Sequence, residues 1–339
     1  MNSITGNMKH IQYILMMTVI VLLAACSQDV ADEQAQEPDA ALRLAGVTRS
    51  ITGDQEYSDI RIFLTNGTTA TEGLFKYAGE SSWTTQLKLK SGVRTYQLYG
   101  YMPDNAGFAH SISDWNENGA VLHIQQLPPL ATQDYCIVTG VRQAVNENDE
   151  TAAVRGAFSF EYDSQRENYI NLFLDHLYSH IIFSMRVGDD YNAVRTIKIK
   201  NMKLQVADIS HYNVDITLTK DVGISSVIHN KIAGTGTYEL TMRDSRQEPV
   251  LTLTTTTTEV CSGYIIPATT LLDKVSLEID YDIYDKKGNK IAERTAINNL
   301  ESPLEDLQRG EERILLVTID PSYLYDLSQK DPPFVVVKQ

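Results

Sequence analysis

The chain has 339 residues and a formal net charge of −15, and 42% of its residues are hydrophobic. This acidic balance argues against partners made of nucleic acid or of anionic lipid headgroups. The length suffices for one large domain or two ordinary domains, and we expect two.

The chain begins with a short apolar segment. Lys9 and His10 precede an apolar run of about 12 residues, from Ile14 to Ala25, which has the length of a secretory signal and is too short to span a membrane. The run ends in Leu-Ala-Ala immediately before Cys26. This pattern resembles a bacterial lipobox, in which the cysteine is acylated and becomes the first residue of the mature chain. The alternative is an ordinary signal peptide followed by an incidental cysteine. We therefore assign residues 1–25 to a lipoprotein signal peptide.

A polar stretch follows Cys26 and continues to Ala41, and it holds no large apolar residue after Val30. Such a segment cannot bury enough apolar surface to order itself, so we interpret it as a tether. More than one acyl chain on a cysteine is needed for a stable anchor. The sequence therefore predicts a folded body held at a membrane by lipid on Cys26.

From about residue 50 onward, apolar residues recur with a period of two, which indicates strands. In the first half the predicted strands are 60–64, 84–89, 93–102, 121–125, 135–141, 157–162 and 170–174. Residues 104–119 are predicted to be a loop, because they are rich in Asp, Asn, Gly and Ser, and residues 146–151 are predicted to be an acidic loop.

The alternation is sharper in the second half, where the predicted strands are 180–187, 196–206, 214–218, 238–242, 250–258, 274–284, 290–296 and 313–319. The stretch 274–284 alternates an apolar face with an acidic one, as in an antiparallel sheet with one wet face. Ser302 and Glu305 form a capping box with proline at the first helical position, which predicts a short helix.

Many short strands with turns about every ten residues and almost no helix indicate an all-β fold built from sandwiches. We predict two antiparallel β-sandwich domains, at residues 50–178 and 179–339, with the boundary placed where the alternation sharpens.

No common catalytic motif is present, so the sequence predicts no catalytic residue, no cofactor and no enzymatic activity. His176 and His180 would share one face of a helix, but the residues after His180 indicate a strand, so no metal ligand is predicted. Asp280, Asp282 and Asp285 offer an alternative site for a hard cation such as calcium. Alternating acids on a wet strand face are more often simply solvated.

The chain has three cysteines, and the tether uses one of them. Cys136 and Cys261 fall in different predicted domains. We expect two buried free thiols, with a disulfide between them as the alternative.

Several segments together resemble a known family. The run from Leu174 to Met185 resembles the opening of its second domain, and the stretch from Tyr264 to Asn289 resembles its long hairpin. The stretch from Leu307 to Tyr325 resembles its closing strand. The family is the fimbrillins, which are lipoprotein precursors of type V pili. The resemblance covers the second half well, whereas the first half is similar mainly in layout.

The resemblance implies two transthyretin-like β-sandwich domains and transport to the outer membrane as a lipoprotein. It also implies cleavage after an early arginine, which removes the lipid and the first strand. The opened groove then accepts a strand from a neighbouring subunit, so the partners would be other pilus subunits. Arg43 and Arg49 fit the cleavage position, which makes residues 26–49 an acylated tether with a removable first strand.

The candidate donor strand is residues 334–337, namely Phe334, Val335, Val336 and Val337. The two prolines before it would hold it extended. The alternative is that these residues form the ordinary last strand of the second sandwich.

The function expected from the resemblance is a structural subunit of an adhesive surface pilus. Two alternatives remain at this point. One is an uncleaved anchor or tip subunit. The other is a monomeric outer-membrane lipoprotein that binds a glycan or protein, for example a host receptor, through loops such as 103–119.

Overall fold

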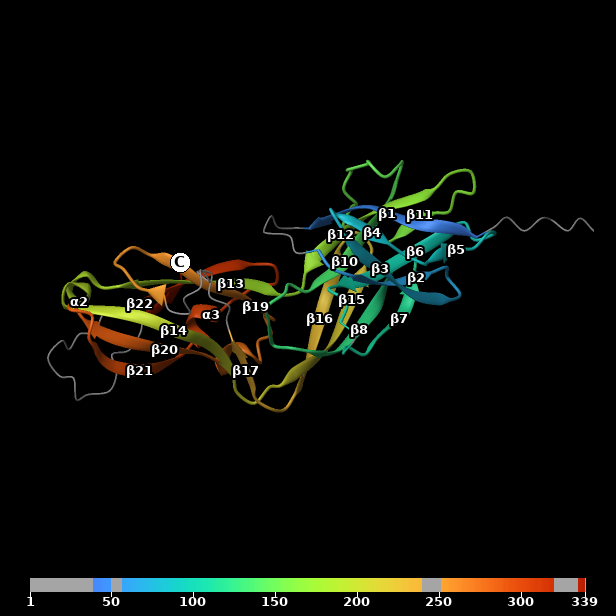
Figure 1. The fold of residues 1–339 in the computed structure, drawn as a ribbon. Helices are drawn as coiled ribbons and strands as arrows, with labels where there is room; N and C mark the ends of the chain where they lie inside the picture. Colours follow the sequence, from blue (N-terminus) through green and yellow to red (C-terminus); the bar gives the residue numbers. More distant parts are fainter. Residues whose placement is uncertain (1–38, 50–56, 106, 240–250, 320–334, 339) are drawn as a thin grey trace, which may run out of the picture. The chain divides into compact units, whose positions relative to one another are not determined.

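The computed structural model describes residues 39–49, 57–105, 107–239, 251–319 and 335–338, and Figure 1 shows its elements. The elements fall within one compact unit made of Ala40–Leu89 and Val93–Gln339. Nearly all of them are strands, so the predicted all-β class is confirmed. The signal segment and Cys26 lie outside the described residues.

The largest sheet of the described part has nine strands. Its path runs β4-β3-β2-β6-β10-β12-β1-β5, and β11 pairs with β6 off this path. The strands are β1 (Ala40–Arg49), β2 (Ile60–Thr65), β3 (Ala70–Gly79), β4 (Ser82–Thr84), β5 (Lys88–Leu89), β6 (Thr95–Met102), β10 (Cys136–Ala144), β11 (Ser159–Glu161) and β12 (Asn168–His176).

The central strands of this sheet bury side chains on both faces, so their apolar residues do not simply alternate with polar ones. In β2, Ile60, Ile62 and Leu64 belong to one buried cluster, and Phe63 belongs to another. A strand that is buried on both sides has no need of polar alternation.

The second sheet has four strands in the order β16-β15-β8-β7. They are β7 (His110–Asn116), β8 (Gly119–Leu127), β15 (His211–Thr219) and β16 (Gly223–Ile232). Strands from both sides of residue 178 therefore share one sheet, and the domain division at that residue stays a prediction. The prediction of a loop at 104–119 was wrong, because β7 lies there. Its residues are mostly polar, and only Ile112 and Trp115 pack against the core.

Two five-stranded sheets form the rest of the described chain, in the orders β23-β22-β13-β19-β9 and β17-β14-β20-β21, with β18 pairing to β14. The first contains β9 (Leu130–Ala131), β13 (Ser179–Val187), β19 (Thr258–Ile265), β22 (Glu312–Ile319) and β23 (Val335–Lys338). The second contains β14 (Arg195–Val206), β17 (Gly236–Glu239), β18 (Leu251–Thr252), β20 (Val275–Asp285) and β21 (Lys290–Asn299). The short helices are α2 (Asp189–Val194), η1 (Leu272–Lys274) and α3 (Glu301–Leu304).

Among the described residues, two strand pairings are parallel, which the prediction of antiparallel sandwiches did not include. β1 runs parallel to β12, and β13 runs parallel to β22. In both pairs the partner lies far along the chain, so no local turn signal could have revealed it.

Two local predictions were wrong. The threonine-rich stretch 250–258 was predicted as one strand, but β18 ends at Thr252 and β19 begins at Thr258. Between them, the Thr254 hydroxyl accepts a hydrogen bond from the Thr256 backbone at 3.3 Å, so threonine supports a turn here. Helix α3 forms without the predicted capping box: the Asn299 side chain accepts from the Glu301 backbone N–H at 2.6 Å.

Candidate functional site

Strand β1 carries both predicted cleavage residues and lies inside the nine-stranded sheet, between β12 and β5. Its parallel register with β12 runs from Leu42 opposite Asn168 to Arg49 opposite Leu174. The side chains of Leu42 and Leu44 are 2% and 8% exposed, respectively. Alternate residues of this strand therefore fill the protein core.

The core beneath β1 is a separate apolar cluster, which we call the β1 core. Strand β1 also contacts β4, so the two ends of the sheet path approach each other around this cluster. Besides the two leucines of β1, the cluster contains side chains from β2, β3, β6, β10 and β12 and the Leu87 and Leu89 side chains. Removal of β1 would therefore uncover apolar surface and leave the β12 edge without a partner.

Gly46 marks an irregularity in β1, because the register with β12 shifts between Leu44 and Gly46. A Cβ atom at Gly46 would lie 3.1 Å from Asn171 Oδ1. The Asn171 amide donates to the backbone carbonyls of Asp149 and Thr151 at 2.6 and 2.7 Å, which fixes its position. The groove that holds β1 therefore accepts two apolar side chains and then a residue without a side chain.

Arg43 lies in the middle of β1 and points outward. Its guanidinium is 3.0 Å from the Glu167 carboxylate, and both side chains are at least half exposed. The ring of Tyr169 lies 5.9 Å from the guanidinium carbon. The bond after Arg43 lies within the strand, so cleavage there would leave the second half of β1 in the sheet.

Arg49 is the last residue of β1. Its guanidinium donates to the Met102 sulfur at 3.7 Å and lies 6.0 Å from the centre of the Tyr57 ring. The residues directly after Arg49, 50–56, lie outside the described part. Cleavage after Arg49 would release the whole of β1.

The candidate donor segment is described in part. Strand β23 pairs antiparallel with β22 at the edge of its sheet, with Val335 opposite Thr318 and Lys338 opposite Leu315. Phe334 lies outside the described residues. In this chain the segment thus occupies the place of a last strand, which was the alternative considered from the sequence.

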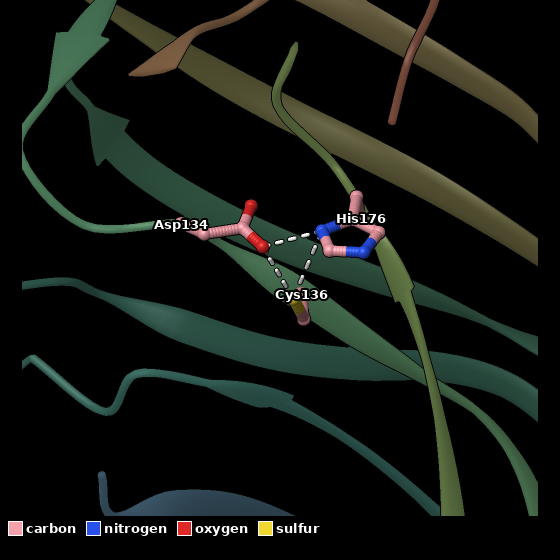
Figure 2. A group of neighbouring side chains, drawn as sticks. All are labelled: Asp134, Cys136 and His176. Atoms are coloured by element: carbon pink, nitrogen blue, oxygen red, sulfur yellow. Dashed lines mark hydrogen bonds and ion pairs between the residues drawn. The ribbon is translucent and has the colours of Figure 1, made fainter. Parts of the chain in front are cut away.

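Three side chains that could bind a metal come together where β10 meets β12 (Figure 2). Cys136 lies directly opposite His176 in the antiparallel ladder, and Asp134 comes two residues before Cys136. Their ligand atoms all lie within 4.8 Å of one another. The Cys136 thiol donates to Asp134 Oδ2 at 3.1 Å, and its sulfur is 3.7 Å from His176 Nδ1. His176 Nδ1 also contacts Asp134 Oδ2.

This cluster is buried. The side chains of Asp134 and His176 are 6% and 12% exposed, respectively, and Cys136 has no exposed surface. Burial raises the pKa of the Cys136 thiol, and the negative charge of Asp134 raises it further, whereas Arg49 lowers it. The sequence did not predict this cluster, because about 40 residues separate His176 from the other two and only strand register brings them together.

A second polar cluster crosses all four strands of the four-stranded sheet. His123 Nδ1 is 2.6 Å from Asp215 Oδ1, and His123 Nε2 is 2.9 Å from the Ser113 hydroxyl. The Asp215 carboxylate also accepts from Asn230 at 3.3 Å, and the Ser113 hydroxyl lies 3.3 Å from Asp114 Oδ2. We interpret these half-exposed, hydrogen-bonded side chains as a cross-strand polar network that stabilises the outer face of the sheet.

The acidic residues considered for calcium have other partners. Asp282 lies 2.9 Å from the Lys290 ammonium, and Asp280 accepts from the Thr295 hydroxyl at 2.5 Å. Asp285 accepts from the Asn289 side-chain amide and from the backbone of Asn289 and Lys287, which stabilises the hairpin turn and lowers the pKa of Asp285. These carboxylates are engaged by lysines, a hydroxyl and turn amides.

His180 does not lie with His176. It faces Glu312 at 3.1 Å and stacks on Tyr264, with ring centres 4.8 Å apart.

Cys136 and Cys261 are both buried free thiols, as expected from the sequence.

No family model matches the sequence, and no curated protein does. Solved structures do show similarity. A fimbrial protein from Bacteroides vulgatus matches with 11% identity and a TM-score of 0.44, over 89% of this chain and 98% of that one. The fimbrial anchor protein Mfa2 from Porphyromonas gingivalis matches with 8% identity and a TM-score of 0.35, over 88% and 96% of the two chains.

Within the described part of the chain, no helix is both long and apolar enough to cross a membrane.

Proposed function

We propose that this protein is a structural subunit of an adhesive pilus on the cell surface. It is exported to the outer membrane as a lipoprotein through acylation of Cys26 and assembles by strand exchange. The observation that carries this proposal is β1. It directly follows the polar tether, fills the β1 core with Leu42 and Leu44, and ends at an arginine.

Strand β1 has the properties that strand exchange needs. Its backbone pairs with β12 along most of its length, and its alternate side chains occupy fixed positions in the core. A replacement strand would gain affinity from the backbone hydrogen bonds and specificity from the two leucine positions. Loss of β1 without replacement would leave apolar surface and a strand edge open to water, which favours capture of a partner strand.

Of the two candidate arginines, we assign the cut to Arg49. Cleavage after Arg49 frees all of β1 together with the tether and the lipid. Cleavage after Arg43 would leave Leu44 in the core and most of the register with β12 in place.

An arginine-specific protease, added to the full chain purified in detergent, tests this assignment. We expect a large fragment that begins at Ser50 and that forms ladders on a gel. Arg49→Ala should block this cut, and Arg43→Ala is the matched control that should leave it unchanged. If the double variant is still cut at the same place, the assignment of the cut is wrong.

Polymer formation tests the stalk role separately. Deletion of residues 331–339 should abolish the ladders if residues 334–337 are the donor strand. Cleaved and folded wild-type protein that stays monomeric would exclude a stalk subunit.

One observation favours a second role. Strand β23 pairs with β22 in the same chain, so its backbone is already engaged. A subunit whose last strand stays paired within its own chain does not donate that strand to a neighbour. An anchor or tip subunit does not need a donor strand. Such a protein would resist cleavage, keep the lipid on Cys26 and still serve adhesion at the cell surface.

A further inference from the structure

We propose that Asp134, Cys136 and His176 bind one zinc-class divalent metal ion at the junction of β10 and β12. This inference is independent of the pilus proposal, since it rests only on the arrangement of these three side chains. Among the described residues, no other group of three such ligands comes together.

The spacing of the ligand atoms fits a tetrahedral ion. Zinc binds sulfur at about 2.3 Å and nitrogen or oxygen at about 2.0–2.2 Å, so two ligand atoms of one tetrahedral ion lie about 3.3–3.7 Å apart. The Cys136 sulfur is 3.1 Å from Asp134 Oδ2 and 3.7 Å from His176 Nδ1. His176 Nδ1 and Asp134 Oδ2 lie closer together than this spacing, so an ion would replace their contact and move these two groups apart by about 1 Å.

The strand register holds the ligands in place without a metal. Cys136 and His176 are opposite each other on neighbouring strands, so their side chains start from the same face. Asp134 lies two residues before Cys136 and returns to that face. Figure 2 shows the three side chains converging from β10, β12 and the segment before β10. A pre-formed set of this kind loses little conformational freedom when an ion binds.

The surroundings leave an unsatisfied group that a metal would satisfy. Asp134 Oδ1 is buried without a hydrogen-bond partner among the described residues, although the carboxylate is 6% exposed. An unpaired buried carboxylate oxygen is costly. An ion that draws the carboxylate towards itself would give this oxygen a partner.

Charge balance also favours a divalent ion. Binding replaces the Cys136 thiol proton, which passes to water, with a metal–sulfur bond. The ion, one thiolate and one carboxylate then sum to zero charge. A neutral site tolerates burial and the positive Arg49 nearby, whose charge acts on Cys136.

The donor set selects the metal class. Sulfur and imidazole nitrogen are poor ligands for calcium and magnesium, which prefer oxygen, whereas a mixture of sulfur, nitrogen and oxygen suits zinc. Three protein ligands leave the fourth tetrahedral position to water or to another ligand.

Metal titration of the full chain tests the site. All forms carry Cys26→Ser, so that Cys136 and Cys261 are the only thiols. After treatment with a chelator, the protein is dialysed against zinc chloride, and its metal content is measured by mass spectrometry. Cobalt(II) replaces zinc in a parallel titration, because its spectrum reports both thiolate ligation and tetrahedral geometry. We expect one zinc per chain and a thiolate-to-cobalt charge-transfer band.

The variants identify the ligands. Cys136→Ser, His176→Gln and Asp134→Asn should each weaken zinc binding at least tenfold, and Cys136→Ser should remove the charge-transfer band. Cys261→Ser and His180→Gln are matched controls and should leave binding unchanged.

Circular dichroism identifies any variant that fails to fold. If a variant fails to fold, the cobalt spectrum of the wild-type protein still tests the proposal. The absence of a thiolate band in the folded wild-type protein would overturn it. Zinc binding that is equal in wild type and in folded Cys136→Ser would also overturn it, since the metal would then be bound adventitiously elsewhere.

Discussion

Arg49 and Leu174 form the last pair of the parallel ladder between β1 and β12. Leu174 is completely buried in the β1 core, whereas the Arg49 guanidinium contacts the Met102 sulfur. The strand thus ends with a basic side chain next to the core that it covers. This pairing makes Arg49 the boundary between the strand and the segment that follows it.

The two leucines of β1 should dominate the stability that this strand contributes. Leu42→Ala and Leu44→Ala each remove a buried side chain, and we expect each to lower the free energy of unfolding by about 2–5 kcal/mol. Urea unfolding followed by circular dichroism measures the change. Arg43→Ala is the control: it alters an exposed ion pair in the same strand and should change stability by at most about 1 kcal/mol. Equal effects at all three positions would contradict the assignment of the core face.

Gly46 should be coupled to Asn171. A methyl group at Gly46 would lie 3.1 Å from the Asn171 side-chain oxygen, and two backbone carbonyls hold that amide in place. We expect Gly46→Ala to lower the free energy of unfolding by about 1–3 kcal/mol. In an Asn171→Ala background the same change should cost less, and a double-mutant cycle measures the difference. Additive effects would show that the close approach is not the cause.

Gly156 and Gly67 separate steric conflict from backbone strain. Both have positive φ, of 78° and 84°, but a Cβ at Gly156 would lie 2.3 Å from the Asp221 backbone nitrogen, whereas Gly67 has open space. Gly67→Ala should cost about 1–2 kcal/mol from the left-handed conformation alone. Gly156→Ala should cost clearly more, because a backbone atom must move. Thermal unfolding of the two variants compares them, and a Gly67 variant that is the less stable of the two would refute this reasoning.

His229 should make stability depend on pH. Burial and, to a smaller extent, the nearby Arg309 charge together lower the pKa of His229 from 6.5 to about 4. Between these two values the unfolded chain binds a proton that the folded chain does not. Stability from this residue is therefore present above pH 6.5 and is lost as the pH falls towards 4. The loss should approach about 3 kcal/mol at most, reduced by partial solvent screening of the ring.

Replacement of His229 by glutamine tests this pH dependence. The difference in free energy of unfolding between wild type and His229→Gln should change steadily from pH 7 to pH 4, with wild type losing relative stability at the acidic end. A difference that stays constant over this range would mean that His229 titrates equally in both states.

Alternation in the sequence was sufficient to predict most strands of the second half. The stretch from Val275 to Asp285 has one apolar face and one polar face, and it forms β20 as expected. Polar edge strands were harder: β7 has too few apolar side chains to show a period, and its pairing with β8 comes from tertiary context.

The candidate sites also differ in whether the sequence alone could predict them. The candidate cleavage residues were chosen because they lie close to the predicted tether in the sequence, and their role stays a prediction. The cluster of Asp134, Cys136 and His176 could not be predicted, because its members meet only through the register of β10 and β12. A sequence shows which residues share a face of one strand, but it does not show which residue lies opposite on the next strand.

The parallel pairing of β1 with β12 also bears on the order of folding. Leu42 is synthesised early, but its partner Asn168 follows only after most of the first half of the chain has been made. Contacts between such distant segments form late, because a long loop must close first. We therefore expect the remainder of the nine-stranded sheet to assemble before β1 docks. The strand that is synthesised first would then be the last to join the sheet, and for the same reason the one most easily exchanged.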